Sequence, residues 1–155
     1  MRIARYYCPE SGKTFSLLPD CLPSRLSGAL VAVEEVVAFV EKSKSVEAAA
    51  DALRPPEMSL PSAVRWVRRR LAPVRAALLA IFTLMPQTFA GYAATVGEAR
   101  RILCTPSALV TLREIAADRL ATLPPPLGFG PRLKPWLRRR ERLQHKVGAD
   151  PPPPN

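Results

Sequence analysis

The stretch SVEAAADALRPPEMSLPSAVRWVRRRL, residues 45–71, organises the chain around two helices joined by a turn. Ser45 is a favoured N-cap for a short helix, which has to end before the proline pair at 55–56. Ser59 is placed to cap a second helix, and Pro61 fits the first turn of that helix, where a missing backbone N–H costs little. This stretch is therefore predicted to form a helix, a turn and a second helix.

The side chains of these two helices fit a helix-turn-helix motif. The alanines at 48–50 are small enough to let the second helix approach the first closely, as a tight helix-turn-helix requires. On the second helix, Val64, Val67 and Leu71 fall at i, i+3 and i+7 and make its core face. The sequence therefore predicts a helix-turn-helix region in residues 27–72, with the second helix as the recognition helix.

Serines and arginines occupy the remaining faces of the recognition helix. The N-terminal part of such a helix enters the major groove of DNA, where hydroxyl groups bond phosphates and arginines reach base edges or the backbone. A solvated arginine face on a surface helix is the alternative interpretation. The residues of this helix that we expect to contact double-stranded DNA are Ser59, Ser62, Arg65, Trp66, Arg68 and Arg69.

The formal net charge of +10 is concentrated in the C-terminal part of the chain. Residues 1–60 carry seven Lys and Arg against eight Asp and Glu, whereas residues 61–155 carry 16 against five. An arginine-rich excess indicates a polyanionic partner or an acidic membrane surface, because the planar guanidinium group fits phosphates. Translation of a high-GC genome produces the same excess, so charge alone leaves the partner open.

Residues 124–155 are predicted to form a Pro-rich linker and a basic tail. The tail gathers basic side chains around Trp136, with Glu141 among them. It would follow the phosphate backbone or the minor groove, and solvated disorder is the alternative. The tail residues that we expect to contact DNA are Arg138, Arg139 and Arg140.

Residues 1–26 are predicted to form a small β-hairpin, with RIARYYC and KTFSLL as strands around a PESG turn. A helix is expected over about residues 27–43, because apolar side chains recur there with the spacing of one helical face. Glu34, Glu35 and Glu41 are expected on the other side of this helix. The apolar positions are Leu30, Val33, Val36, Val37 and Val40.

The C-terminal half, residues 73–123, is also predicted to be helical, so the fold class is mainly α. Pro73 should kink or end the recognition helix, because proline lacks the backbone N–H and its ring clashes with the preceding turn. The helices expected beyond it cover about residues 74–85, 88–104 and 106–123, the last one capped by Thr105 or Ser107.

The uncharged run Ala76–Gly97 is long enough to cross a bilayer. Only its first part, residues 76–85, is strongly apolar, because a proline, a glutamine and two glycines interrupt its second part. We predict a buried core helix here, with a membrane-associated protein as the alternative.

Three segments resemble, in this order, the N-terminal region of insertion-sequence transposases and related orphan proteins: RYYCPESGKTFSLLPDCLPSR, SVEAAADAL and SLPSAVRWVRRRL. In that family a zinc ribbon of the type Cys-x-x-Cys-Gly-Arg-Thr-Phe precedes a leucine-proline stretch, a long helix and a helix-turn-helix. The resemblance covers about residues 5–72 and implies recognition of DNA.

The chain departs from this family at the metal site. Ser11 stands where the second cysteine of the knuckle is expected, and a structural zinc ion needs four Cys or His ligands. Cys8, Cys21, Cys104 and His145 are the only candidates in the sequence, and their spacing resembles no known finger. The hairpin is therefore predicted to be a degenerate, metal-free ribbon.

The cysteines also indicate in which cellular compartment the protein is expected. Three cysteines without repeated spacing do not form a disulfide framework, and the N-terminus MRIARYYCPESGK lacks the apolar core of a secretory signal. We therefore expect a cytoplasmic protein.

The chain is not expected to be an enzyme. Transposase catalysis uses a carboxylate triad on a sheet that holds two metal ions, and the few carboxylates beyond residue 72 come without an alternating βα pattern. No cofactor and no small-molecule substrate is indicated. We predict a double-stranded DNA-binding protein related to a transposase recognition region. The alternative is a helical protein-interaction subunit with a nonspecific basic tail, and a homodimer or a helical partner stays open.

The serine at position 11 leads to a test of the metal-free ribbon. The purified protein should hold no stoichiometric zinc, and a chelator should leave its melting temperature unchanged, because the knuckle lacks a thiolate that a four-ligand site requires. Elemental analysis and thermal melts with and without chelator measure this. One zinc ion per chain would overturn the interpretation.

Overall fold

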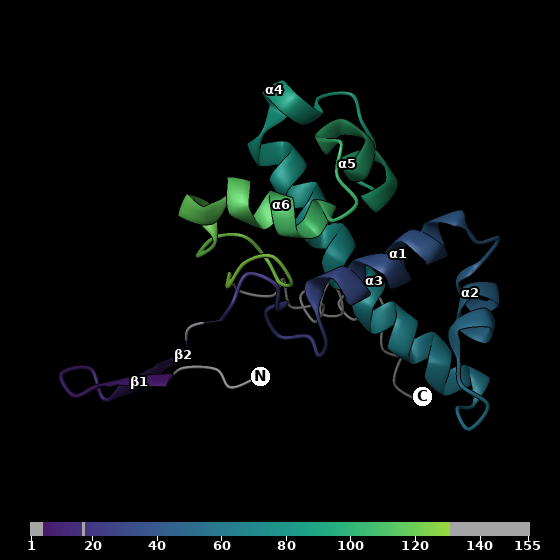
Figure 1. Ribbon diagram of the computed structural model, residues 1–155, viewed down its shortest axis with the longest axis horizontal. Coiled ribbons are helices and arrows are strands. Elements are labelled where there is room, and N and C mark those ends of the chain that lie inside the picture. Colours follow the sequence, from purple (N-terminus) through teal and green to yellow (C-terminus); the bar gives the residue numbers. More distant parts are fainter. Residues whose placement is uncertain (1–4, 17, 131–155) are drawn as a thin grey trace, which may run out of the picture.

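The computed structural model describes residues 5–16 and 18–130 and is mainly helical, as the sequence predicts (Figure 1). A two-stranded sheet lies at the N-terminus, and the buried residues of the helices form one core. The strands are β1 (Arg5–Cys8) and β2 (Lys13–Ser16). The helices are α1 (Leu30–Lys42), α2 (Val46–Leu53), α3 (Leu60–Leu84), α4 (Pro86–Phe89), α5 (Val96–Leu103) and α6 (Ala108–Ile115), followed by a short 3-10 helix, η1 (Ala117–Arg119).

The predicted N-terminal hairpin is present. β1 pairs antiparallel with β2, with Tyr6 opposite Phe15, and Gly12 takes a positive φ of 61° in the turn. Glycine reaches this conformation without steric cost. The hairpin extends away from the helical body in Figure 1, and Tyr6 and Tyr7 are 57% and 65% exposed. The core of the fold is therefore made by residues from α1 onward.

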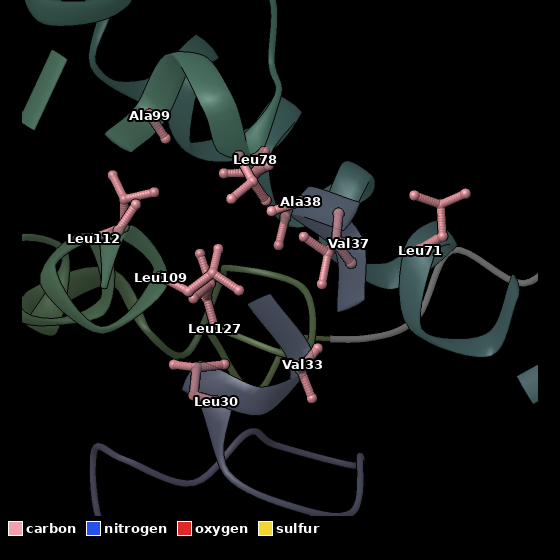
Figure 2. Packing of buried hydrophobic residues seen from close by; sticks show 14 of the residues in the cluster. Leu30, Val33, Val37, Ala38, Leu71, Leu78, Ala99, Leu109, Leu112 and Leu127 are labelled. Carbon is pink, nitrogen blue, oxygen red and sulfur yellow. The ribbon is translucent and has the colours of Figure 1, made fainter. Parts of the chain in front are cut away.

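α1 occupies the centre of the helical body and contacts α2, α3, α5 and α6. Four of the five residues of its predicted apolar face are at most 5% exposed, namely Leu30, Val33, Val37 and Val40, whereas Val36 is only half-buried. Figure 2 shows side chains of α1 in one cluster with leucines of α6 and with Leu127. Residues from distant parts of the chain therefore share one core.

α3 is one continuous helix of 25 residues, so the prediction of a separate helix after Pro73 is wrong. Of the predicted core face, Val67 and Leu71 are buried and Val64 is half-buried. The apolar stripe continues in phase beyond Pro73, and its burial outweighs the cost of about 3 kcal/mol for an interior proline. The boundary drawn after residue 72 thus lies inside a helix. The buried residues of α3 are Ala63, Val67, Leu71, Val74, Ala77, Leu78, Ile81 and Phe82.

The last two predicted helices are shorter than expected. Residues 88–104 divide into the end of α4, a bend at Gly91 with a positive φ of 81°, and α5. Residues 106–123 hold α6 and η1, with Ser107 at the N-cap position of α6. The Ser107 side chain makes no capping hydrogen bond, so the capping group comes from elsewhere.

The uncharged run Ala76–Gly97 begins in the second half of α3 and includes α4. Some of its apolar side chains enter the core, with Leu78 and Phe89 at most 2% exposed, whereas Leu79 and Leu84 are 62% and 39% exposed. Phe82 stacks on Phe89 at a ring-centroid distance of 4.2 Å. Among the helices of the described residues, none combines the length and the apolar composition that a membrane span requires.

Residues 124–130, predicted as the start of a linker, are packed against the helical body. Leu127 is fully buried. At Gly128 an added Cβ would lie 2.3 Å from the carbonyl oxygen of Leu123, so only glycine permits this close approach of the two backbones. This part of the predicted linker therefore belongs to the fold.

Two carboxylates of α1 cap the helices of the C-terminal half. Glu34 is fully buried and accepts the first two N–H groups of α6, at 3.0 and 2.8 Å. Glu41, two turns further along α1, accepts the first two N–H groups of α5, at 3.0 and 3.1 Å. A carboxylate in this place satisfies donors that have no partner within the helix and interacts favourably with the helix dipole. The prediction that these two glutamates lie on the far side of α1 is wrong, because each faces a helix start.

Arg100 of α5 completes the environment of the buried carboxylate. Its Nε donates to Glu34 at 2.7 Å, and its Nη2 donates to the exposed Glu35 at 2.5 Å. Partial burial lowers the pKa of the Arg100 guanidinium, but the hydrogen bonds to the two glutamates outweigh this effect and raise the pKa above its ordinary value. The charge of Glu34 is thus paired and hydrogen-bonded, which a buried charge requires.

Glu34 and Glu35 offer a matched pair of variants. Glu34→Gln should lower the free energy of unfolding by about 3 kcal/mol, because it removes a buried, paired charge that caps α6. Glu35→Gln removes the same charge beside the same Arg100, but its side chain is 61% exposed, and the expected cost is below about 1 kcal/mol. Urea unfolding followed by circular dichroism measures both. Equal losses would contradict the central role of the buried cap.

Candidate nucleic-acid interface

α2 and α3 pack against each other, as the small side chains predict. Ala49 and Ala50 of α2 and Ala63 of α3 are at most 1% exposed, whereas Ala48, the third alanine of the prediction, is exposed. Ser45 caps α2, because its Oγ accepts a backbone N–H at 3.0 Å. The connection, residues 54–59, has six residues, against about three to four in most helix-turn-helix motifs. The two helices therefore have the predicted order and close contact, with a longer turn.

The start of α3 brings three of the predicted DNA-contacting residues together. Ser59 occupies the N-cap position without a capping hydrogen bond from its side chain, and its Oγ donates to the Oγ of Ser62 at 3.0 Å. Nη2 of Arg65 donates to the same hydroxyl at 3.3 Å. Ser59 and Arg65 are exposed, so this polar cluster faces solvent.

Arg68 takes part in the contact between the two helices. Its Nη2 lies 2.9 Å from a carboxylate oxygen of Glu47 on α2, and the two side chains are 63% and 54% exposed. An exposed pair of this kind contributes at most about 1 kcal/mol to stability. Arg68 nonetheless differs from Arg65 and Arg69, which form no ion pair with a described residue.

An open groove of about 470 Å³ runs beside the N-terminal part of α3, and we call it the arginine groove. α3 supplies five of its lining residues, and the segment before α1 supplies the other three. Among the described residues that line it, none is a carboxylate. Cations gathered in a cleft raise the local potential and attract polyanions. The lining residues are Arg25, Leu26, Ser27, Ser62, Arg65, Trp66, Arg69 and Arg70.

Trp66 and Arg70 form a stacked pair in the arginine groove. The guanidinium carbon of Arg70 lies 3.9 Å from the centroid of the Trp66 ring, and its Nη1 donates to the Trp66 carbonyl at 3.3 Å. Burial lowers the pKa of Arg70 below its ordinary value, yet arginine stays charged at neutral pH. Trp66 thus lines the groove with one ring face covered by a cation.

Two of the four arginines in the groove, Arg25 and Arg70, are not among the DNA-contacting residues predicted from the sequence. Arg70 follows Trp66 by one helical turn, and this i, i+4 spacing is a local signal that identifies the pair. Arg25 lies in an irregular segment before α1, 40 positions from Arg65, so no local pattern connects it to α3.

The other predicted sites lie apart from the groove or outside the described residues. The tail arginines at 138–140 and His145 belong to the second group. Cys8, Cys21 and Cys104 are free thiols. In the part of the chain that the structure describes, no group of three or more His, Cys, Asp or Glu is arranged to hold a metal ion.

Comparison with known proteins adds no relative. No protein-family model, no curated protein and no solved structure matches the chain. The resemblance of residues 5–72 to transposase N-terminal regions therefore stays a prediction.

The stacking of Arg70 on Trp66 should contribute measurably to stability. Arg70→Met keeps most of the aliphatic stem but removes the cation, and it should lower the free energy of unfolding by about 0.5–1 kcal/mol. Arg69→Met, at an exposed position of the same helix, should change it by less than about 0.5 kcal/mol. Urea unfolding compares the two variants, and a larger loss for Arg69→Met would contradict the stacked pair.

Proposed function

We propose that the chain binds double-stranded DNA and that the N-terminal part of α3 enters the major groove. The observation that carries this proposal is the arginine groove, in which Arg25, Arg65, Arg69 and Arg70 gather without a carboxylate among the described lining residues. Guanidinium groups bond phosphates and guanine edges with two parallel hydrogen bonds. The arginine groove therefore suits the charge and the chemistry of a DNA strand.

The composition of α3 supports its assignment as the recognition helix. Its 25 residues include five arginines and no Asp or Glu. Its apolar stripe is buried, while Arg65, Arg68, Arg69 and Arg75 are exposed. A helix of this kind presents positive charge to a phosphate backbone while the core holds it in place.

The arginines of α3 differ in how firmly they are held. Arg69 is exposed and has no hydrogen bond or ion pair to any described residue. Arg65 keeps only a long hydrogen bond to Ser62, whereas Arg68 is paired with Glu47. We therefore assign base reading to Arg65 and Arg69 and a weaker backbone contact to Arg68.

We further propose that the chain is a recognition module rather than an enzyme. The resemblance of residues 5–72 to transposase N-terminal regions supports this interpretation, and the basic tail at 138–140 would add contacts to the phosphate backbone. The free thiols of the described cysteines support a reducing, cytoplasmic setting.

A protein-interaction role is the second candidate, and one surface favours it. Leu84 and Ile115, 39% and 45% exposed, line an open groove of about 250 Å³ near the C-terminal end of α3. Large apolar side chains that gather on a surface mark protein contacts. A helical partner or a second copy of the chain would cover them.

Selection of bound sequences from random duplex DNA tests the proposed function. With the preferred sequence in hand, Arg65→Ala and Arg69→Ala should each cost about 1–3 kcal/mol of binding free energy and relax the preference at one position, because each removes a base contact. Arg139→Ala in the tail should instead weaken all sequences alike and flatten the salt dependence by about one phosphate contact.

Two outcomes would count against the proposed function. Unchanged binding in both α3 variants, with intact folding by circular dichroism, would exclude α3 as the helix that reads DNA. Binding that persists on random duplex and disappears only when residues 132–155 are deleted would favour the interaction subunit with a nonspecific tail.

A further inference from the structure

We propose that Arg25 binds a backbone phosphate of the DNA strand in the arginine groove, and that the C-terminal half of the fold holds Arg25 in place for this contact. This inference rests on the proposed function and extends it to a segment outside the two helices of the motif. It also gives the residues around α6 and 123–130 a part in binding.

Arg25 reaches the groove from an uncommon backbone conformation. Its φ is 59°, in the left-handed region that residues other than glycine rarely adopt. Such a conformation persists where the surrounding structure holds it. Together with Leu26 and Ser27, Arg25 lines the groove that α3 lines with Arg65 and Arg69. The bend therefore adds a cation from a second element to those of α3.

Hydrogen bonds that Ser24 donates hold the backbone directly before Arg25. The N–H of Ser24 donates to the carbonyl of Pro126 at 2.9 Å, and its buried hydroxyl donates to the carbonyl of Gly128. The hydroxyl bond joins residues 104 positions apart in the sequence. The residue that precedes Arg25 is therefore fastened to the C-terminal end of the described chain.

Arg113 of α6 fastens the same segment a few residues earlier. Its side chain is 1% exposed, and its Nη1 donates to the carbonyl of Leu22 and, at 3.4 Å, to that of Asp20. Its Nε lies 3.7 Å from a carboxylate oxygen of Asp20. A buried guanidinium needs such partners, so Arg113 and the segment before Arg25 are placed relative to each other.

The segment whose carbonyls accept the hydrogen bonds of Ser24, residues 126–130, has little freedom to move. Leu127 is fully buried, and the N–H of Gly130 donates to the carbonyl of Leu123 at 2.8 Å. An added Cβ would lie 2.3 Å from the Leu123 oxygen at Gly128 and 2.5 Å from the Thr122 oxygen at Gly130. The backbones are in direct contact here, so the two carbonyls that accept from Ser24, those of Pro126 and Gly128, are held in place.

A phosphodiester is the ligand that this arrangement fits. Phosphate contacts fix the register of a protein on DNA without reading its sequence, and they are best made from a rigid support. Arg25 stands on such a support beside the recognition helix. Lipid headgroups offer the same phosphate chemistry, and binding to phosphatidylglycerol vesicles serves below to distinguish them from DNA.

Salt-dependent binding of the full-length chain to the selected duplex tests the phosphate contact. Arg25→Ala should weaken binding on the order of tenfold at low salt, for preferred and random sequences alike, and lower the slope of log K against log salt by about 0.9. Arg25→Gly should do the same with the fold intact, because glycine adopts the left-handed conformation freely. Arg119→Ala, which removes the same charge from an exposed pair with Asp118, is the control and should change neither quantity.

Ser24→Ala tests the positioning step. It removes the hydroxyl bond to Gly128, and it should weaken binding severalfold and speed hydrogen exchange at the N–H of residue 24. The double variant Ser24→Ala with Arg25→Ala should bind no more weakly than Arg25→Ala alone, because Ser24 acts through Arg25. Additive losses would overturn the positioning role.

The remaining outcomes separate this inference from the proposed function. If Arg69→Ala loses sequence preference while Arg25→Gly behaves like Arg119→Ala, the phosphate role of Arg25 is wrong and the proposed function stands. If the unaltered chain binds no duplex, both fall. Binding to phosphatidylglycerol vesicles but not to DNA, lost in Arg25→Gly, would overturn the inference and assign the groove to a lipid headgroup.

Discussion

The carboxylate of Glu34 lies where α1, α5 and α6 meet, with no exposed surface. One of its oxygens accepts from Nε of Arg100 and from the N–H of Ala108, and the other accepts from the N–H of Leu109. A buried charge is costly unless it is paired and hydrogen-bonded, so this one group makes the positions of three helices interdependent. If α6 shifted, the carboxylate of Glu34 and the first N–H groups of α6 would lose their hydrogen-bond partners at the same time. Glu41 repeats the arrangement at α5, and the C-terminal half is thereby attached to α1 at two helix starts.

The arginine groove depends on this attachment of the C-terminal half to α1, although the groove lies away from Glu34 and Glu41. α6 carries Arg113, which bonds the carbonyls of residues 20 and 22, and the chain beyond α6 supplies the acceptors for Ser24. These contacts hold the segment that brings Arg25 to α3. Hydrogen bonds and packed backbone thus connect the buried cap at Glu34 with the arginine groove. The described residues of the C-terminal half supply no lining residue of this groove, but they position the segment that carries Arg25.

One face of α3 is buried in the core, and another face lines the arginine groove. Its buried stripe runs from Ala63 to Phe82 and belongs to the single core, and the helix contacts α1, α2 and α4. Pro73 lies between the two halves without ending the helix, because burial on both sides exceeds the loss of one hydrogen bond. The exposed face carries Arg65 and Arg69 on a support that extends through the molecule.

The sequence by itself determined the features that depend on neighbours within a few positions. The cap at Ser45, the apolar face of α1, the small alanines between α2 and α3 and the hairpin all follow from local spacing and local chemistry. Local spacing also placed Arg65 and Arg69 on the exposed side of α3. Only the tertiary structure decided that Glu34 is buried, that α3 continues through Pro73, that residues 124–130 pack into the body and that Arg25 joins the groove. The physical reason is that these outcomes are set by contacts between residues far apart in the chain. A glutamate beside an apolar stripe has the same local pattern whether it faces water or the start of α6, 74 positions away.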